Sequence, residues 1–95
     1  MRQNYDSEFN LSLGRLMERR RLAEGLSRRG VLNLLQESRS TQILACYELG
    51  QKPVPLPFII KWCDGMGVAL DQLLDLVKHD MARDPWPAKV DVTVP

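Results

Sequence analysis

The sequence predicts a single, soluble, all-α domain built from five short helices. Apolar residues recur at helical spacing in five separate segments, and glycine or proline residues stand between most of these segments. A chain of 95 residues is long enough for one hydrophobic core and leaves little room for a deep substrate cleft. The longest apolar runs, such as residues 58–60, are far too short to span a membrane.

The first two helices are expected over residues 11–24 and 28–36, after an N-terminal arm of residues 1–10. Gly25 is placed to end the first helix, because glycine adopts the left-handed conformation of a helix C-terminus at little cost. Ser27 is a typical N-cap for the second helix, since its hydroxyl can accept a hydrogen bond from a free backbone N–H. Helical spacing predicts these inward-facing residues: Leu13, Leu16, Met17, Val31, Leu34 and Leu35.

The third helix is expected over residues 41–49, between a polar turn and a stop at Gly50. The turn, residues 37–41, is rich in capping residue types, and Ser40 is the expected N-cap. The inward face of this helix is predicted to consist of Leu44 and Tyr47.

Prolines at positions 53, 55 and 57 predict an extended connector, because proline is tolerated only in the first turn of the helix that follows. The fourth helix is expected over residues 56–66, ended by Gly67, and the fifth over residues 70–82. The residues expected to face inward are Ile59, Trp62, Cys63, Met66, Leu73, Leu74 and Val77.

Residues 83–95 form a C-terminal tail in this division of the chain. Val90, Val92 and Val94 alternate with polar residues, which predicts one half-buried strand. Pairing with the same strand of a second subunit would satisfy its open edge and create two-fold symmetry. We therefore expect the fifth helix and the tail to form a dimer contact, with a loose terminus as the alternative.

Chemistry-bearing side chains are few and scattered. Two cysteines, Cys46 and Cys63, and the single histidine, His79, do not form a spaced set of metal ligands, so neither a metal nor another cofactor is expected. No catalytic constellation and no motif for a small-molecule ligand is present in the sequence, which argues against an enzyme. Lone thiols and a start without an apolar signal segment favour a cytoplasmic location.

Charge is distributed unevenly along the chain, although the formal net charge is only +1. Residues 15–52 contain eight basic and four acidic residues, a balance of +4. The flanking segments, residues 1–14 and 53–95, have balances of −1 and −2. This asymmetry indicates an anionic partner for the basic half.

Three motifs resemble, in order, those of the lambda-repressor/Cro-like (XRE) family of helix-turn-helix domains. They are RLAEGLS at residues 21–27, YELG at residues 47–50 and GVALDQLL at residues 67–74, and the whole match covers about residues 11–76. The chain departs from the common pattern, because the turn glycine is missing and about two extra residues precede Glu48. In that spacing it resembles the branch of actinobacterial developmental regulators.

The resemblance implies a five-helix helix-turn-helix domain, placed at residues 11–82, that binds double-stranded DNA. It further implies a transcriptional regulator that acts as a homodimer on a palindromic operator. A protein-interaction module on the same fold, such as an antitoxin or adaptor, is the alternative, because a fold does not determine a function. The basic half of the chain favours DNA.

In this family the third helix enters the major groove, which implies base contacts by its outward residues: Thr41, Gln42, Ile43, Ala45 and Cys46. Gln42 is the strongest candidate, because a primary amide can pair bidentately with adenine. Ile43 is suited to the thymine methyl group. The alternatives are a solvated Gln42 and an inert, partly buried Cys46 thiol.

Candidate phosphate contacts are Arg21, Ser27, Arg28, Arg29, Arg39, Ser40 and Lys52. Arg28 and Arg29 stand in the first turn of the second helix, where free backbone N–H groups also favour an anion. The alternative is a solvated basic face, and at least one arginine of residues 19–21 is expected to pair with Glu18, Glu24 or Glu48. The resemblance implies a structural role for Glu48, a salt bridge that braces the third helix, and no second acid near it in sequence supports catalysis.

Overall fold

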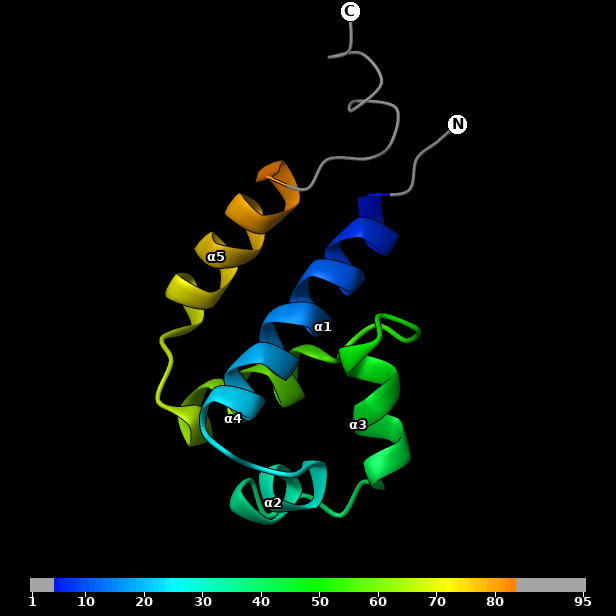
Figure 1. Ribbon diagram of the computed structural model, residues 1–95, viewed down its shortest axis with the longest axis vertical. Helices are drawn as coiled ribbons and strands as arrows, with labels where there is room; N and C mark the ends of the chain where they lie inside the picture. The colour runs from blue at the N-terminus through cyan, green and yellow to red at the C-terminus, as the bar shows by residue number, and fades with distance from the viewer. Residues whose placement is uncertain (1–4, 84–95) are drawn as a thin grey trace, which may run out of the picture.

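The computed structural model describes residues 5–83, and within that range the chain is all-α, with five helices and no strand (Figure 1). The elements are α1 (Tyr5–Ala23), α2 (Arg28–Leu34), α3 (Thr41–Glu48), α4 (Leu56–Met66) and α5 (Leu70–Arg83). The long helix α1 has α5 running antiparallel on one side and α3 on the other, while α2 packs against α3 (Figure 1). The predicted all-α class and the number of helices are confirmed.

The start of the first helix was placed too late by the sequence pattern. α1 begins at Tyr5, so most of the predicted arm of residues 1–10 is helical instead. Asp6 and Glu8 favour this first turn, because acidic side chains complement the positive end of the helix dipole. Phe9 then packs against the core.

At the other end, α5 continues through Arg83, which the sequence pattern assigned to the tail. The predicted strand at residues 90–94 lies outside the described residues.

The helix caps are those that the sequence predicts. The Ser27 hydroxyl accepts a hydrogen bond of 2.9 Å from the Gly30 N–H, and the Ser40 hydroxyl accepts one of 3.2 Å from the Ile43 N–H. After α2, the place of the missing turn glycine is taken by Gln36, with φ = 55°. A side chain in this left-handed region carries a conformational cost that glycine avoids.

The core is assembled from all five helices around Phe58 and Trp62, which are each 2% exposed. Two predicted core residues are wrong: Leu34 is 51% exposed and Leu74 is 37% exposed. α2 instead turns Leu32 inward together with the correctly predicted Val31 and Leu35. The complete buried apolar set is Leu13, Met17, Val31, Leu32, Leu35, Leu44, Tyr47, Val54, Phe58, Ile59, Trp62, Cys63, Met66, Leu73 and Val77.

A close backbone approach holds α3 against α1. A Cβ atom at Gly14 would overlap the carbonyl oxygens of Tyr47 and Glu48, so only glycine permits the observed spacing. The position and tilt of α3 are therefore determined by the middle of α1.

A buried polar link joins α1 to α5. The Ser12 hydroxyl donates to Asp80 Oδ2 at 2.5 Å, and Arg15 Nη2 pairs with the same oxygen at 2.8 Å. Burial alone would raise the pKa of Asp80, but the hydrogen bonds from Ser12 and Arg15 outweigh it and hold that pKa below its ordinary value. Asp80 is consequently ionised and paired in the fold.

Candidate nucleic-acid interface

α3 presents one narrow outward stripe, here named the α3 outer face: Thr41, Gln42, Ala45 and Cys46. Gln42 is exposed, and the other three residues are half-buried. Their spacing places them on one side of the helix, while Leu44, Tyr47 and Glu48 are buried on the opposite side. Four of the five predicted base-contact residues therefore share one accessible surface.

The fifth, Ile43, does not belong to this stripe. Its side chain is half-buried and packs against the hydrophobic core. The 100° step between successive helical residues turns it toward the edge of the α3 outer face. The predicted thymine contact of Ile43 is thus disfavoured by its position.

The predicted phosphate contact of Arg21 is disfavoured, because this side chain is buried and paired inside the protein. It is only 8% exposed and holds the carboxylate of Glu48 with two hydrogen bonds, from Nε at 2.8 Å and from Nη2 at 3.1 Å. Arg21 Nη1 donates to the carbonyl oxygen of Leu26 at 2.9 Å. Arg21 lies on the inner side of α1, so its guanidinium has no free edge for a phosphate.

Glu48 is the centre of this network, and the predicted salt bridge is present. Its side chain is 2% exposed and also accepts a hydrogen bond of 2.9 Å from Arg28 Nε. The network therefore ties α3 to both α1 and the start of α2. Arg28 is only half-buried, which leaves part of its guanidinium at the surface.

Arg39, two residues before α3, is held in position by an ion pair and by an aromatic ring. Its Nη1 pairs with Glu37 Oε1 at 2.7 Å, and its guanidinium lies 5.2 Å from the centroid of the Phe58 ring. Lys61 of α4 pairs with the other Glu37 oxygen at 2.7 Å. The hydrogen bond from Lys61 is the main reason that the pKa of Glu37 is lowered. The sequence carries no signal for this pairing, because Glu37 and Lys61 belong to separate elements.

Two of the predicted phosphate contacts stay fully available. Arg29 in the first turn of α2 and Lys52 in the loop after α3 are exposed, and neither forms an ion pair with any residue in the range 5–83. The hydroxyls of Ser27 and Ser40 are used as acceptors by the helix caps, but each can still donate its own proton to an anion.

Within residues 5–83, no helix is long and apolar enough to cross a membrane. In the same part of the chain, no three His, Cys, Asp or Glu side chains are grouped so as to hold a metal ion. No protein-family model, curated protein or solved structure matches this chain significantly.

Proposed function

We propose that this chain is a sequence-specific transcriptional regulator that binds double-stranded DNA through α3. The observation that carries the proposal is the α3 outer face, a short, Ser40-capped stripe with small side chains around one exposed amide. Small side chains at Thr41, Ala45 and Cys46 would let the helix approach the base edges closely. Gln42 would then read an adenine through its amide oxygen and nitrogen.

Phosphate contacts would come from basic residues next to this stripe. Arg39 precedes α3, Lys52 follows it, and Arg28 and Arg29 begin α2, which packs against it. Arg28 and Arg39 already have carboxylate partners, so they are pre-positioned but less free than Arg29 and Lys52. Such contacts fix orientation on the duplex and carry no sequence information.

A homodimer on a palindromic operator is the arrangement that we propose. Two recognition helices related by two-fold symmetry would read half-sites about one helical turn apart. An exposed apolar residue on α5 supports this proposal. Helical spacing assigns Leu74 to the core, but its side chain is 37% exposed and could be covered by a second subunit. Leu74 would then lie in the predicted dimer contact of the fifth helix, whereas residues 84–95 of the predicted tail lie outside the described residues.

The decisive experiment selects bound duplexes from a random pool and tests whether the enriched sequence is palindromic. Binding is then titrated with salt by fluorescence anisotropy. Arg29 and Lys52 alone supply four phosphate contacts per dimer, and Arg28 and Arg39 raise the number to eight. At about −0.9 per contact, the log–log slope should lie between about −4 and −7.

Arg19→Ala is the matched control, because it removes an exposed cation from the side of α1 that faces α5, away from α3, and should leave this slope unchanged. No enrichment together with a slope near zero would instead favour a protein-interaction module.

A further inference from the structure

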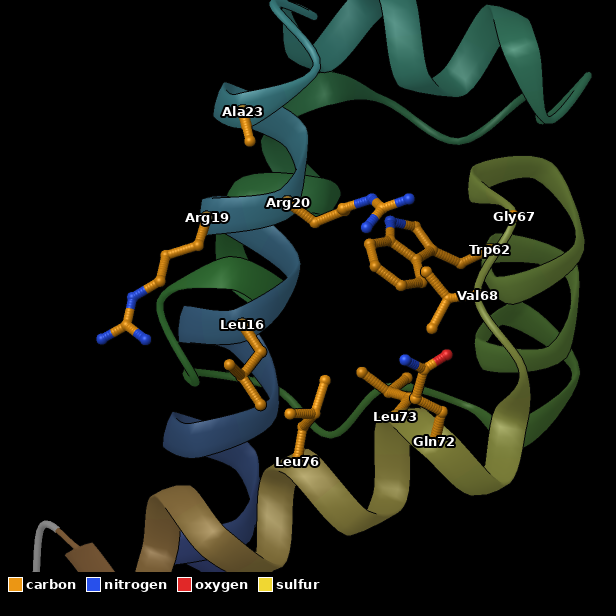
Figure 2. A pocket seen from close by; sticks show the side chains of 10 residues that line it. All are labelled: Leu16, Arg19, Arg20, Ala23, Trp62, Gly67, Val68, Gln72, Leu73 and Leu76. Carbon is orange, nitrogen blue, oxygen red and sulfur yellow. The ribbon is translucent and has the colours of Figure 1, made fainter.

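A hollow lies on the side of α1 that faces α5, away from α3, and it is here named the α1–α4–α5 hollow (Figure 2). It is formed by the C-terminal half of α1, the end of α4 and the beginning of α5. Its volume is about 390 Å³, which falls within the range of about 300–1,000 Å³ typical of small-molecule sites. The proposed DNA contacts use none of its lining residues.

The floor of this hollow is apolar and made of buried side chains. Trp62 and Leu73 are each 2% exposed, so only the edges of these side chains reach the hollow. Leu16 and Val68 cover the sides, and Leu76, which is 46% exposed, stands at the rim. A ring or a short alkyl chain can pack between Leu16 and Leu76, with the edge of the Trp62 indole beneath it.

Two polar side chains enter the hollow from opposite walls (Figure 2). Arg20 extends from α1 across the indole of Trp62, and Gln72 points from α5 toward the same space. Arg20 Nη2 donates to the Met66 carbonyl oxygen at 3.1 Å, and its Nε pairs with Glu24 at 3.2 Å. The guanidinium is thereby held in place, while its Nη1 has no hydrogen-bond partner among residues 5–83.

The charged residues that line the hollow are Arg19 and Arg20, and Arg20 keeps its Nη1 free of partners among residues 5–83 beside its ion pair with Glu24. No acidic residue of the described chain lines the hollow, and the Arg19 side chain at its rim points away from it, so Arg20 is the cation that faces a ligand (Figure 2). The Gln72 side chain forms no hydrogen bond with the described residues, so its N–H₂ group is available as a donor.

We infer that the α1–α4–α5 hollow binds a small amphipathic carboxylate. The apolar part of the ligand lies against Leu16, Leu76 and the edge of Trp62, and its carboxylate accepts hydrogen bonds from Arg20 and Gln72. No sequence motif marks this site, because its residues come from three separate helices. The inference is independent of DNA binding.

The test uses the full chain with Trp86→Phe, which leaves Trp62 as the single tryptophan of the two in the sequence. The fluorescence of Trp62 is followed while 4-phenylbutyrate is added. We expect a saturable change with a Kd below about 1 mM. The uncharged isostere 4-phenylbutanamide should bind at least about tenfold more weakly, since it lacks the charge that Arg20 recognises.

Variants then separate charge recognition from general apolar binding. Arg20→Gln should weaken 4-phenylbutyrate at least about tenfold and leave the amide unchanged. Lys78→Gln is the control, because it removes an exposed cation from α5 outside the hollow. If Arg20→Gln fails to fold by far-UV circular dichroism, Gln72→Leu replaces it, with an expected loss of about threefold or more for the carboxylate.

Three results would overturn the proposal. The first is the absence of a saturable change up to about 10 mM. The second is equal affinity for the carboxylate and the amide. The third is a saturable change that appears only after deletion of residues 84–95 or only at low protein concentration, because the tail or a second copy would then occupy the hollow.

Discussion

Removing Arg21 should destabilise the fold far more than removing Arg28, although both side chains pair with Glu48. The Arg21 side chain is 8% exposed and makes two hydrogen bonds to the carboxylate, at 2.8 and 3.1 Å. The Arg28 side chain is 35% exposed and makes one, at 2.9 Å. Solvent therefore screens the second pair and not the first.

The expected magnitudes follow from this difference in burial. Breaking a buried ion pair by removing one partner costs about 3–5 kcal/mol, because the other charge stays buried. In Arg21→Met, Arg28 still pairs with Glu48, so we expect a loss near the lower limit, about 3 kcal/mol. In Arg28→Met, the buried pair survives, and the loss should be about 1 kcal/mol or less.

Urea unfolding followed by far-UV circular dichroism measures both losses. For a domain of this size the slope is about 1–1.5 kcal/mol per molar urea, so Arg21→Met should lower the midpoint by about 2–3 M. Arg28→Met should lower it by less than about 1 M. The double variant Arg21→Met/Glu48→Leu should lose less than Arg21→Met alone, because it removes both charges. Equal midpoints for the two single variants would show that burial does not make the Arg21 pair stronger than the Arg28 pair.

The remaining predictions concern the turn, the α1–α5 link and DNA recognition. Gln36→Gly should stabilise the fold by about 0.5–1 kcal/mol, because glycine adopts the observed φ of 55° without strain; thermal melting checks this, with an expected rise of several degrees. The pKa of Asp80 is lowered in the folded state, so its ion pair adds fully to the free energy of unfolding above the unfolded-state pKa of about 4. This stabilisation is lost as the pH falls through the lower pKa of the folded state. Asp80→Asn should therefore cost about 1–3 kcal/mol at neutral pH and flatten the loss of stability in acid, as measured by urea unfolding at several pH values. Gln42→Ala should reduce discrimination between the selected duplex and random DNA by about 1–3 kcal/mol, whereas Arg29→Ala should weaken both alike and make the salt slope shallower by about 2 per dimer, both measured by anisotropy.

Each of these predictions has a contradicting result. A lower melting temperature for Gln36→Gly would show that the Gln36 side chain contributes more than its backbone strain costs. An acid transition that is unchanged in Asp80→Asn would remove Asp80 as its origin. A uniform loss of affinity in Gln42→Ala would show that this side chain does not read bases.

The features predicted best from the sequence are those that depend only on residues close together in the chain, such as helix caps and helix ends. Ser27 and Ser40 cap their helices as expected, since a cap needs only a hydroxyl three residues ahead of a free N–H. Gly25 and Gly67 end helices with φ = 72°, again a local requirement. The all-α class and most of the core followed from helical periodicity.

Sequence reasoning misplaced residues whose burial depends on contacts between distant parts of the chain. Arg21 looked like one more exposed cation, but the partner that buries it is Glu48, 27 residues further along the chain. Periodicity admitted both Leu32 and Leu34 in a helix as short as α2, and only packing turned Leu32 inward. The polar first turn of α1 showed no apolar periodicity, so its start at Tyr5 was missed. The α1–α4–α5 hollow has no sequence signal, because packing alone brings its three helices together.

Contact between the α3 outer face and DNA bases is the basis of the proposed function. The most direct measurement is a two-dimensional ¹H–¹⁵N NMR spectrum of the labelled protein, recorded with and without the selected duplex. We expect the largest chemical-shift changes in the backbone amides of Gln42, Ala45 and Cys46, with a second group at the start of α2 and at Lys52. Changes concentrated on α5, or spectra that are identical with and without DNA, would contradict it.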